Sequence, residues 1–128
     1  MNRESLAKVA SDIVSSGRGI LAADESTGTM SSRLQGVGVD PSEEARRSYR
    51  ANLFATPGCE AAVSGVILFD ETIRQMMDDG TPIPDYMVAQ DILPGIKVDT
   101  GAHPLANHDG EKITEGLDGL RTRCIEYF

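Results

Sequence analysis

Hydrophobic and polar positions along this chain follow periods that predict helices separated by buried strands. Residues 4–15 have apolar side chains at i, i+3, i+4, i+7 and i+8, the pattern of an amphipathic helix, and Gly17 suits its end. Residues 19–24 open with an uninterrupted apolar run, and residues 63–69 contain another. A continuous apolar run is typical of a strand buried on both faces in a parallel sheet. A third strand is predicted at 96–99.

The segments between these runs contain helix signals. The sequence from Asp40 to Glu43 predicts a helix start with Asp40 as the capping residue. One face of that helix is then expected to contain Ala45, Tyr49 and Leu53, at i, i+4 and i+8. Shorter helices or turns are predicted around 31–34, after Asp70 as a cap, at 85–90 and from 117 to the end, with residues 100–114 as a loop.

Strands that alternate with helices indicate the α/β class, with a parallel sheet and right-handed crossovers. We expect Asp24 and Lys97 to lie at the same end of that sheet. Three parallel strands do not close a barrel, so both edges of the sheet expose unpaired backbone groups. The side chains that we expect on the inner face, without an opposite wall, are Ile20, Ala22, Val66, Leu68 and Ile96.

Composition limits the class of protein and its partners. The chain has 128 residues, the size of one ordinary domain, and 40% of them are hydrophobic, which argues against disorder. The net charge of −8 argues against nucleic acid or an anionic membrane as a partner, although a few lysines and arginines can still form a local anion site. Cys59 and Cys124 have no metal-ligand spacing and are interpreted as free thiols in a reducing cytoplasm. We see no signal peptide and no apolar run long enough to span a membrane.

Two carboxylates follow the first predicted strand, and hydroxyl-bearing residues follow them directly. Catalytic groups of parallel α/β sheets lie at the C-terminal ends of strands. Asp24 and Glu25 therefore either end the strand as polar, capping residues, or place in Asp24 a catalytic carboxylate that orients a substrate hydroxyl or holds an ammonium group. Ser26, Thr27 and Thr29 are either turn formers or ligands of phosphate oxygens.

Two basic residues extend this candidate site. Arg33 has the forked donor that matches phosphate geometry. Lys97 lies between Ile96 and Val98 in the third predicted strand, and lysine is rarely buried without a partner. Lys97 therefore points its ammonium group into a pocket, lies on an edge strand, or extends its stem toward solvent.

Other polar residues are assigned to the surface. The arginines of the helix after Asp40 are expected on a solvated face paired with glutamates of the same helix: Arg46, Arg47 and Arg50 with Glu43 and Glu44. His103 and His108 lie in one Gly/Pro-containing segment without a matching acid or cysteine, so we expect no metal site there.

At these residues the chain resembles class I fructose-bisphosphate aldolase. The resemblance extends from about Ile13 to the end of the sequence. Its first motif is long and therefore specific. The matching stretches are Gly19-Ile20-Leu21-Ala22-Ala23-Asp24-Glu25-Ser26-Thr27-Gly28-Thr29, Ser64-Gly65-Val66-Ile67-Leu68-Phe69, Gly95-Ile96-Lys97-Val98-Asp99 and Gly116-Leu117-Asp118-Gly119-Leu120.

The resemblance implies a TIM (β/α)8 barrel, incomplete in this chain, with its active site at the C-terminal mouth. The 128 residues would form the N-terminal part of one barrel domain: a leading helix in 1–17, then the first three strand–helix units in 18–128. The family is a lyase of glycolysis and gluconeogenesis that reversibly cleaves fructose 1,6-bisphosphate to dihydroxyacetone phosphate and glyceraldehyde 3-phosphate. It uses a Schiff-base lysine, with no metal or other cofactor.

Residue roles follow from the same resemblance. Asp24 would be the catalytic carboxylate near the Schiff-base lysine. The residues that would hold a substrate phosphate are Ser26, Thr29, Arg33 and Lys97. Ser32 stands where many members have a basic residue, which implies fewer phosphate contacts on that side. Arg46 is a weaker correspondence, and we favour a surface position for it.

The resemblance also places the Schiff-base lysine and further acid–base residues on strands beyond Phe128. We therefore expect this chain to be inactive by itself. The alternative is a non-catalytic remnant that binds phosphates weakly or associates with full-length subunits. We expect a sugar phosphate as the ligand, a cytoplasmic location, no nucleic-acid or membrane partner, and a homo-oligomer in the full-length form.

Overall fold

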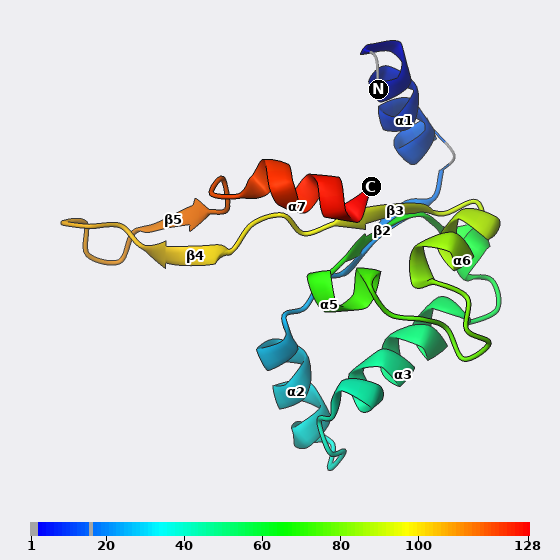
Figure 1. Ribbon diagram of the computed structural model, residues 1–128, viewed down its shortest axis with the longest axis horizontal. Coiled ribbons are helices and arrows are strands. Elements are labelled where there is room, and N and C mark those ends of the chain that lie inside the picture. The colour runs from blue at the N-terminus through cyan, green and yellow to red at the C-terminus, as the bar shows by residue number, and fades with distance from the viewer. Residues whose placement is uncertain (1–2, 16) are drawn as a thin grey trace. The chain divides into compact units, whose positions relative to one another are not determined.

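The computed structural model of the protein describes residues 3–15 and 17–128. It contains two compact units, the first ending at Ile96 and the second formed by Lys97–Phe128 (Figure 1). The first unit has the helices α1 (Arg3–Ser15), α2 (Thr27–Gly36), α3 (Glu43–Phe54), α4 (Cys59–Ala62), α5 (Asp70–Ile73) and α6 (Ile83–Ala89), and the strands β1 (Gly19–Ala23), β2 (Val63–Leu68) and β3 (Leu93–Ile96). The second unit has β4 (Gly101–Pro104), β5 (Lys112–Glu115) and α7 (Leu120–Tyr127).

The three strands of the first unit form a parallel sheet in the order β1-β2-β3, as the sequence predicts. Ala23 pairs with Leu68, and Leu68 pairs with Ile96, so the carboxyl ends of the three strands lie at the same end of the sheet. Gly95 permits the close approach of two strands, because a Cβ atom there would lie 3.2 Å from the Val66 carbonyl oxygen. This α/β architecture positions the segments that leave the carboxyl ends of the strands.

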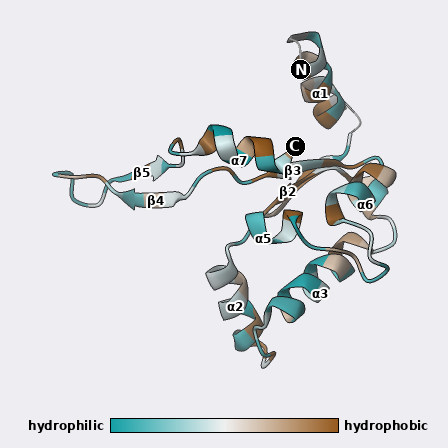
Figure 2. Cartoon of the chain, viewed as in Figure 1, coloured by the Kyte–Doolittle hydropathy of each residue, from teal (hydrophilic) through white to brown (hydrophobic). Residues whose placement is uncertain are grey.

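Helices α3 and α6 pack on one face of this sheet and form the core with it (Figure 1). The buried apolar residues are Ala23, Ala51, Phe54, Val66, Leu68, Met77, Ile83, Met87 and Ile92. Figure 2 shows hydrophobic residues along the strands of the sheet and hydrophilic residues along much of α3. Burial of this apolar area is the main favourable term in the stability of the unit.

The expected inner face of the sheet combines residues from its two faces: Ile20 and Ala22 are exposed as expected, and Val66 and Leu68 are not. Val66 and Leu68 are 1% and 0% exposed because they point into the core beneath the helices. By the strand register, Leu21 and Ala23 share that face. Ile20, one position out of phase, is 54% exposed. Apolar runs without polar residues cannot show which side faces the helices, because both sides of such a strand look alike.

Several predicted boundaries also differ. Strand β3 spans Leu93–Ile96, so Lys97 follows the strand instead of lying within it. The predicted loop at 100–114 contains an antiparallel pair, β4 with β5, whose side chains are mostly exposed. Helix α2 begins at Thr27, earlier than predicted. A one-turn helix, α4, precedes β2 and was not predicted.

Two of the predicted helix caps are also wrong. Ser42 caps α3 in place of Asp40, because the Ser42 hydroxyl accepts the Ala45 amide at 3.1 Å. Asp70 does not cap α5. It is the first residue of that helix and pairs with Arg74 at 3.0 Å.

One arginine of α7 joins two backbone segments of the second unit by hydrogen bonds. Arg123 donates to the Val98 carbonyl at 2.9 Å and to the Gly116 carbonyl at 2.6 Å. Gly116 has a φ of +144°, and a Cβ atom there would lie 2.7 Å from the Asp99 Cα. Only glycine fits this crossing of two backbone segments.

Candidate functional site

The candidate site is built at the end of the sheet where the carboxyl ends of β1 and β2 lie. Asp24, which follows β1, is partly buried. Among the side chains and amides that the structure describes, none forms a hydrogen bond or ion pair with the Asp24 carboxylate. A partly buried carboxylate without a protein partner, at the carboxyl edge of a parallel sheet, is available to a reactant.

Ser26 and Thr29 lie at the start of α2. The Ser26 hydroxyl caps the helix by accepting the Thr29 amide at 3.3 Å, and it lies 3.1 Å from the Thr29 hydroxyl. The turn-forming alternative is therefore correct for Ser26. Its cap leaves the first helical amides directed outward, and helix N-termini favour anions. Cap formation and phosphate binding are thus compatible at this segment.

Arg33 lies on α2 and forms an ion pair with Glu25. The Arg33 side chain is 59% exposed and that of Glu25 is 21% exposed. Ser32, where a basic residue was expected from the resemblance, donates its hydroxyl to the Gly28 carbonyl at 3.0 Å. The four site residues of the first unit, Asp24, Ser26, Thr29 and Arg33, therefore come from one continuous segment spanning the end of β1 and α2.

Lys97 begins the second unit and forms an ion pair with Asp99. The Asp99 carboxylate also accepts the Gly101 amide at 3.0 Å. The hydrogen bond from Lys97 is the main reason that the pKa of Asp99 lies below its ordinary value. Lys97 is therefore a paired, partly exposed cation, and none of the three sequence alternatives included this partner.

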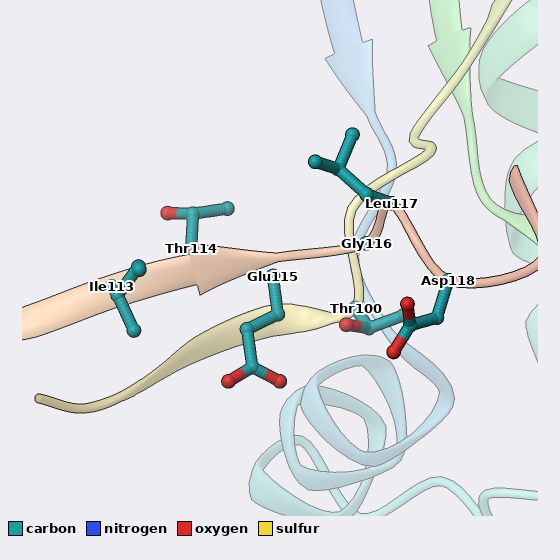
Figure 3. A pocket seen from close by; sticks show the side chains of 7 residues that line it. All are labelled: Thr100, Ile113, Thr114, Glu115, Gly116, Leu117 and Asp118. Atoms are coloured by element: carbon teal, nitrogen blue, oxygen red, sulfur yellow. The ribbon is translucent and has the colours of Figure 1, made fainter. Parts of the chain in front are cut away.

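A cavity of about 260 Å³ in the second unit is lined by residues of β5, by the turn that follows β5, and by Thr100 (Figure 3). Ile113, Thr114 and Leu117 contribute apolar surface, and Glu115 and Asp118 contribute carboxylates. None of the predicted site residues lines this cavity. An acidic and apolar hollow does not suit an anionic ligand, so we do not assign the site to it.

Sequence reasoning missed two buried arginines and a glutamate that support the site. Arg46 and Arg50 are 9% and 0% exposed, which contradicts the expected solvated face. The buried residues of α3 are Arg46, Arg50, Ala51 and Phe54, and most of them lie one residue out of phase with the predicted apolar face. Arg47 pairs with Glu44 at 2.7 Å as expected, but its side chain is only 19% exposed.

Glu71 of α5 is the partner that allows Arg46 to be buried. The Arg46 Nε lies 2.9 Å from both carboxylate oxygens of Glu71, and Thr27 donates to the same carboxylate at 3.3 Å. This bidentate hydrogen bonding holds the pKa of Glu71 below its ordinary value. Glu71 lies in the first turn of α5, shortly after the end of β2, and this position near a strand end was the available signal.

Comparison with known proteins agrees with this geometry. The family model described as "Glycolytic: Fructose-bisphosphate aldolase class-I" matches residues 5–128. The chain belongs to the class I fructose-bisphosphate aldolase family. A protein of Xanthomonas campestris pv. campestris named "Probable fructose-bisphosphate aldolase class 1" is 54% identical over 128 residues, which are 100% of this chain and 38% of that protein.

Two further relatives extend the comparison. "Fructose-bisphosphate aldolase 6, cytosolic" of Arabidopsis thaliana is 53% identical over 112 residues, 88% of this chain and 31% of the relative. A crystal structure of fructose-bisphosphate aldolase from Plasmodium falciparum, in complex with TRAP and a small-molecule inhibitor, superposes with a TM-score of 0.91 at 46% identity. It covers 97% of this chain and 36% of the Plasmodium chain. The chain thus corresponds to an N-terminal portion, less than two-fifths of these aldolases.

Proposed function

We propose that this chain contributes the first part of a fructose 1,6-bisphosphate aldolase active site. The complete enzyme would reversibly cleave the bisphosphate to dihydroxyacetone phosphate and glyceraldehyde 3-phosphate, as a lyase of glycolysis and gluconeogenesis. The observation that carries this proposal is the unpaired, partly buried Asp24 carboxylate beside the capped N-terminus of α2. An anion site and a carboxylate in one segment suit a phosphorylated polyol.

The residues divide by chemistry. Asp24 would orient a substrate hydroxyl and hold the ammonium group of an imine-forming lysine. Ser26, Thr29 and the first amides of α2 would bind a phosphate group by donating hydrogen bonds to its oxygens. Arg33 would bind the same group. Lys97 would add a positive charge from the start of the second unit. Each of these cations is now paired with a carboxylate, Glu25 or Asp99, so phosphate would compete with an internal anion.

We propose that the chain by itself is inactive. A lysine that forms an imine must lose its proton through desolvation or a neighbouring charge. The three lysines of the sequence are Lys8, Lys97 and Lys112. Lys8 is 75% exposed and paired with Asp12, Lys97 is paired with Asp99, and Lys112 is exposed on β5. In this proposal the Schiff-base lysine and the remaining barrel strands lie outside the chain.

The experiment is a chimera in which residues 1–128 of this chain replace the matching segment of the Xanthomonas campestris relative. We expect the chimera to cleave fructose 1,6-bisphosphate in a coupled assay, and the 128-residue chain alone not to do so. Asp24→Ala should abolish most of the activity of the chimera, whereas the matched control Asp109→Ala, on the exposed β4–β5 connection, should retain it. Equal activities of the two variants would contradict the proposed role of Asp24.

A second candidate is a non-catalytic remnant that binds phosphates weakly or associates with full-length subunits. The observation that favours it is the parallel sheet, whose edge strands β1 and β3 each pair with one other strand among the described residues, with Ile20 exposed. The intact mass of the native protein separates the two candidates, because a mass near 13.7 kDa corresponds to the short product. A larger mass, or downstream coding sequence with another lysine-bearing strand, favours the enzyme.

The remaining expectations are part of the same proposal. We propose a cytoplasmic protein that forms homo-oligomers when full-length and needs no metal. No helix in the described part of the chain has the length and hydrophobicity needed to cross a membrane. Among the described residues, no three His, Cys, Asp or Glu side chains cluster as metal ligands. Stoichiometric zinc in the purified protein, removable with loss of structure, would contradict the metal-free mechanism.

A further inference from the structure

Arg50 of α3 is fully buried yet almost unpaired. Its exposed fraction is 0%, and its Nε and Nη1 atoms have no hydrogen-bond partner among the described residues. The Nη2 atom donates to the Glu25 carbonyl at 2.6 Å and lies 3.9 Å from the Glu25 carboxylate. The buried guanidinium of Arg50 therefore has polar contacts with a single described residue, Glu25.

This arrangement is unfavourable for folding alone. A buried charge with unsatisfied donors costs free energy, and well-packed apolar residues of similar volume are often as stable or more stable. Burial lowers the pKa of Arg50 from its ordinary value, and the nearby Glu25 charge opposes that shift only in part. Local rules of this kind are most often broken where a side chain has a functional task.

The position of Glu25 indicates what that task is. The Glu25 carbonyl belongs to the peptide that links it to Ser26, so the hydrogen bond from Arg50 fixes the peptide between Asp24 and the cap of α2. The Glu25 carboxylate also accepts a hydrogen bond from the Arg33 guanidinium. Arg50 thus contacts Glu25 from the buried side, while Asp24, Ser26 and Arg33 retain some exposure.

The same helix fixes the next residues independently. Arg46, one turn before Arg50, holds the Glu71 carboxylate, which accepts the Thr27 hydroxyl at 3.3 Å. Arg46 also donates to the Pro41 carbonyl at 2.7 Å. Two arginines spaced i, i+4 on α3 therefore reach Glu25 and Thr27, the first residue directly and the second through Glu71.

We propose that Arg50 is a positioning residue for anion recognition: its guanidinium sets the Glu25–Ser26 peptide, and through Glu25 the Arg33 side chain, in the geometry that binds a phosphate group. Arg50 does not touch the ligand. This inference rests on the proposed function, because it assigns Arg50 to the phosphate site of that function. Loss of a purely structural residue would weaken phosphate binding and folding stability together. Loss of Arg50 should instead weaken phosphate binding without lowering stability.

The test uses the 128-residue chain and three variants. Arg50→Met removes the buried charge at similar volume, and Glu25 stays partly exposed and paired with Arg33, so no buried charge is left alone. Arg50→Lys keeps a cation that can reach the Glu25 carbonyl. Arg47→Met is the matched control on the same helix, since Arg47 contacts Glu44, Asp78 and the Met76 carbonyl and none of the residues 25–29. The probe is inorganic phosphate, titrated against the backbone amide and arginine Nε signals in ¹⁵N NMR spectra, with urea unfolding measured in parallel.

We expect Arg50→Met to have an unfolding midpoint equal to or above that of the parent chain. We also expect it to shift the signals of residues 25–29 and Arg33, and to bind phosphate about tenfold more weakly, because small misplacements of positioning groups have effects of this size or larger. Arg50→Lys should recover most of the affinity, and Arg47→Met should bind within twofold of the parent.

Two outcomes would overturn the positioning role. One is unchanged phosphate affinity in Arg50→Met. The other is loss of affinity in proportion to a lowered unfolding midpoint, with Arg50→Lys equally impaired, which is the behaviour of a structural residue. If Arg50→Met does not fold, the Arg50→Lys spectra decide the question.

Failure of the proposed function has a different signature. In that case the parent chain would not bind phosphate at all. The signals of residues 25–29 and of Arg33 would still report whether Arg50 sets this segment, and unchanged signals in Arg50→Met would overturn the positioning role.

Discussion

At the scale of single residues, the site contrasts one carboxylate without a partner with several that are neutralised. Asp24 has no hydrogen-bonding or ionic partner in the described chain, whereas Glu25, Glu71 and Asp99 each pair with a cation. Paired carboxylates support their surroundings, and a carboxylate that is left unpaired near an anion site is suited to act on a reactant.

Asp24 and Lys97 should therefore respond differently to removal in the chimeric enzyme. Asp24→Ala should lower kcat by about 10²–10⁴-fold with little change in KM, because an oriented carboxylate acts mainly on the transition state. Lys97→Ala should instead raise KM, most clearly for fructose 1,6-bisphosphate compared with the 1-phosphate. Steady-state kinetics with both substrates measure this, and the same pattern in both variants would contradict the division of roles.

Glu71 gives a prediction on pH. Its folded pKa lies below the ordinary 4.5, mainly because of Arg46, so its contribution to stability is complete above about pH 4.5 and is lost as the pH falls through the folded pKa. Glu71→Gln should lower the free energy of unfolding by about 1–3 kcal/mol at pH 7, since it leaves Arg46 without its charged partner. Urea titrations should show this difference shrinking below pH 4.5.

The control for this prediction is Glu111→Gln, on the exposed segment before β5. The free energy of unfolding of Glu111→Gln should match that of the parent chain at pH 7 and at pH 3. A Glu71→Gln effect that stays constant from pH 7 to pH 3 would show that the carboxylate charge is not the cause.

At the scale of elements, α2 combines a helix cap with the proposed phosphate contact, and two substitutions of Ser26 separate these roles. Ser26→Asp retains a capping acceptor and adds a charge that the helix dipole favours, so stability should be kept or slightly raised. The same carboxylate repels an anion, so phosphate binding should disappear. Ser26→Ala should lose about 1 kcal/mol of stability together with part of the binding.

Thermal unfolding and phosphate titration of the same samples measure both effects of these Ser26 substitutions. Ser48→Ala on α3 is a serine control away from the cap. Undiminished phosphate binding by Ser26→Asp would exclude the start of α2 as the anion site.

At the scale of the whole molecule, the parallel sheet of the first unit has β1 and β3 as its edge strands, and we propose that the Schiff-base lysine lies outside the chain. Borohydride trapping with dihydroxyacetone phosphate should give no covalent adduct with the 128-residue chain, while the chimera should be trapped. Sedimentation of the chain should show self-association that grows with concentration, because exposed edges and residues such as Ile20 favour pairing. An adduct formed at rates that support turnover, or a strictly monomeric chain with cooperative unfolding, would contradict these expectations.

The sequence by itself determined the α/β class, the three parallel strands and the segment from Asp24 to Arg33. Uninterrupted apolar runs predict doubly buried strands, and a local motif keeps its residues together in any fold. The family also follows from the sequence, because the motif from Gly19 to Thr29 is long enough to be specific.

Tertiary structure alone decided which face of each element is buried and which charges are paired. Arg46 and Arg50 look like surface residues by pattern, and only the fold shows that they are buried and that their partners, Glu71 and the Glu25 carbonyl, come from distant segments. The face of β2 under the helices depends equally on contacts with Phe54 and Met87. A period along the chain reports hydrophobicity, whereas the cost of burying a charge depends on acceptors that the fold brings from elsewhere.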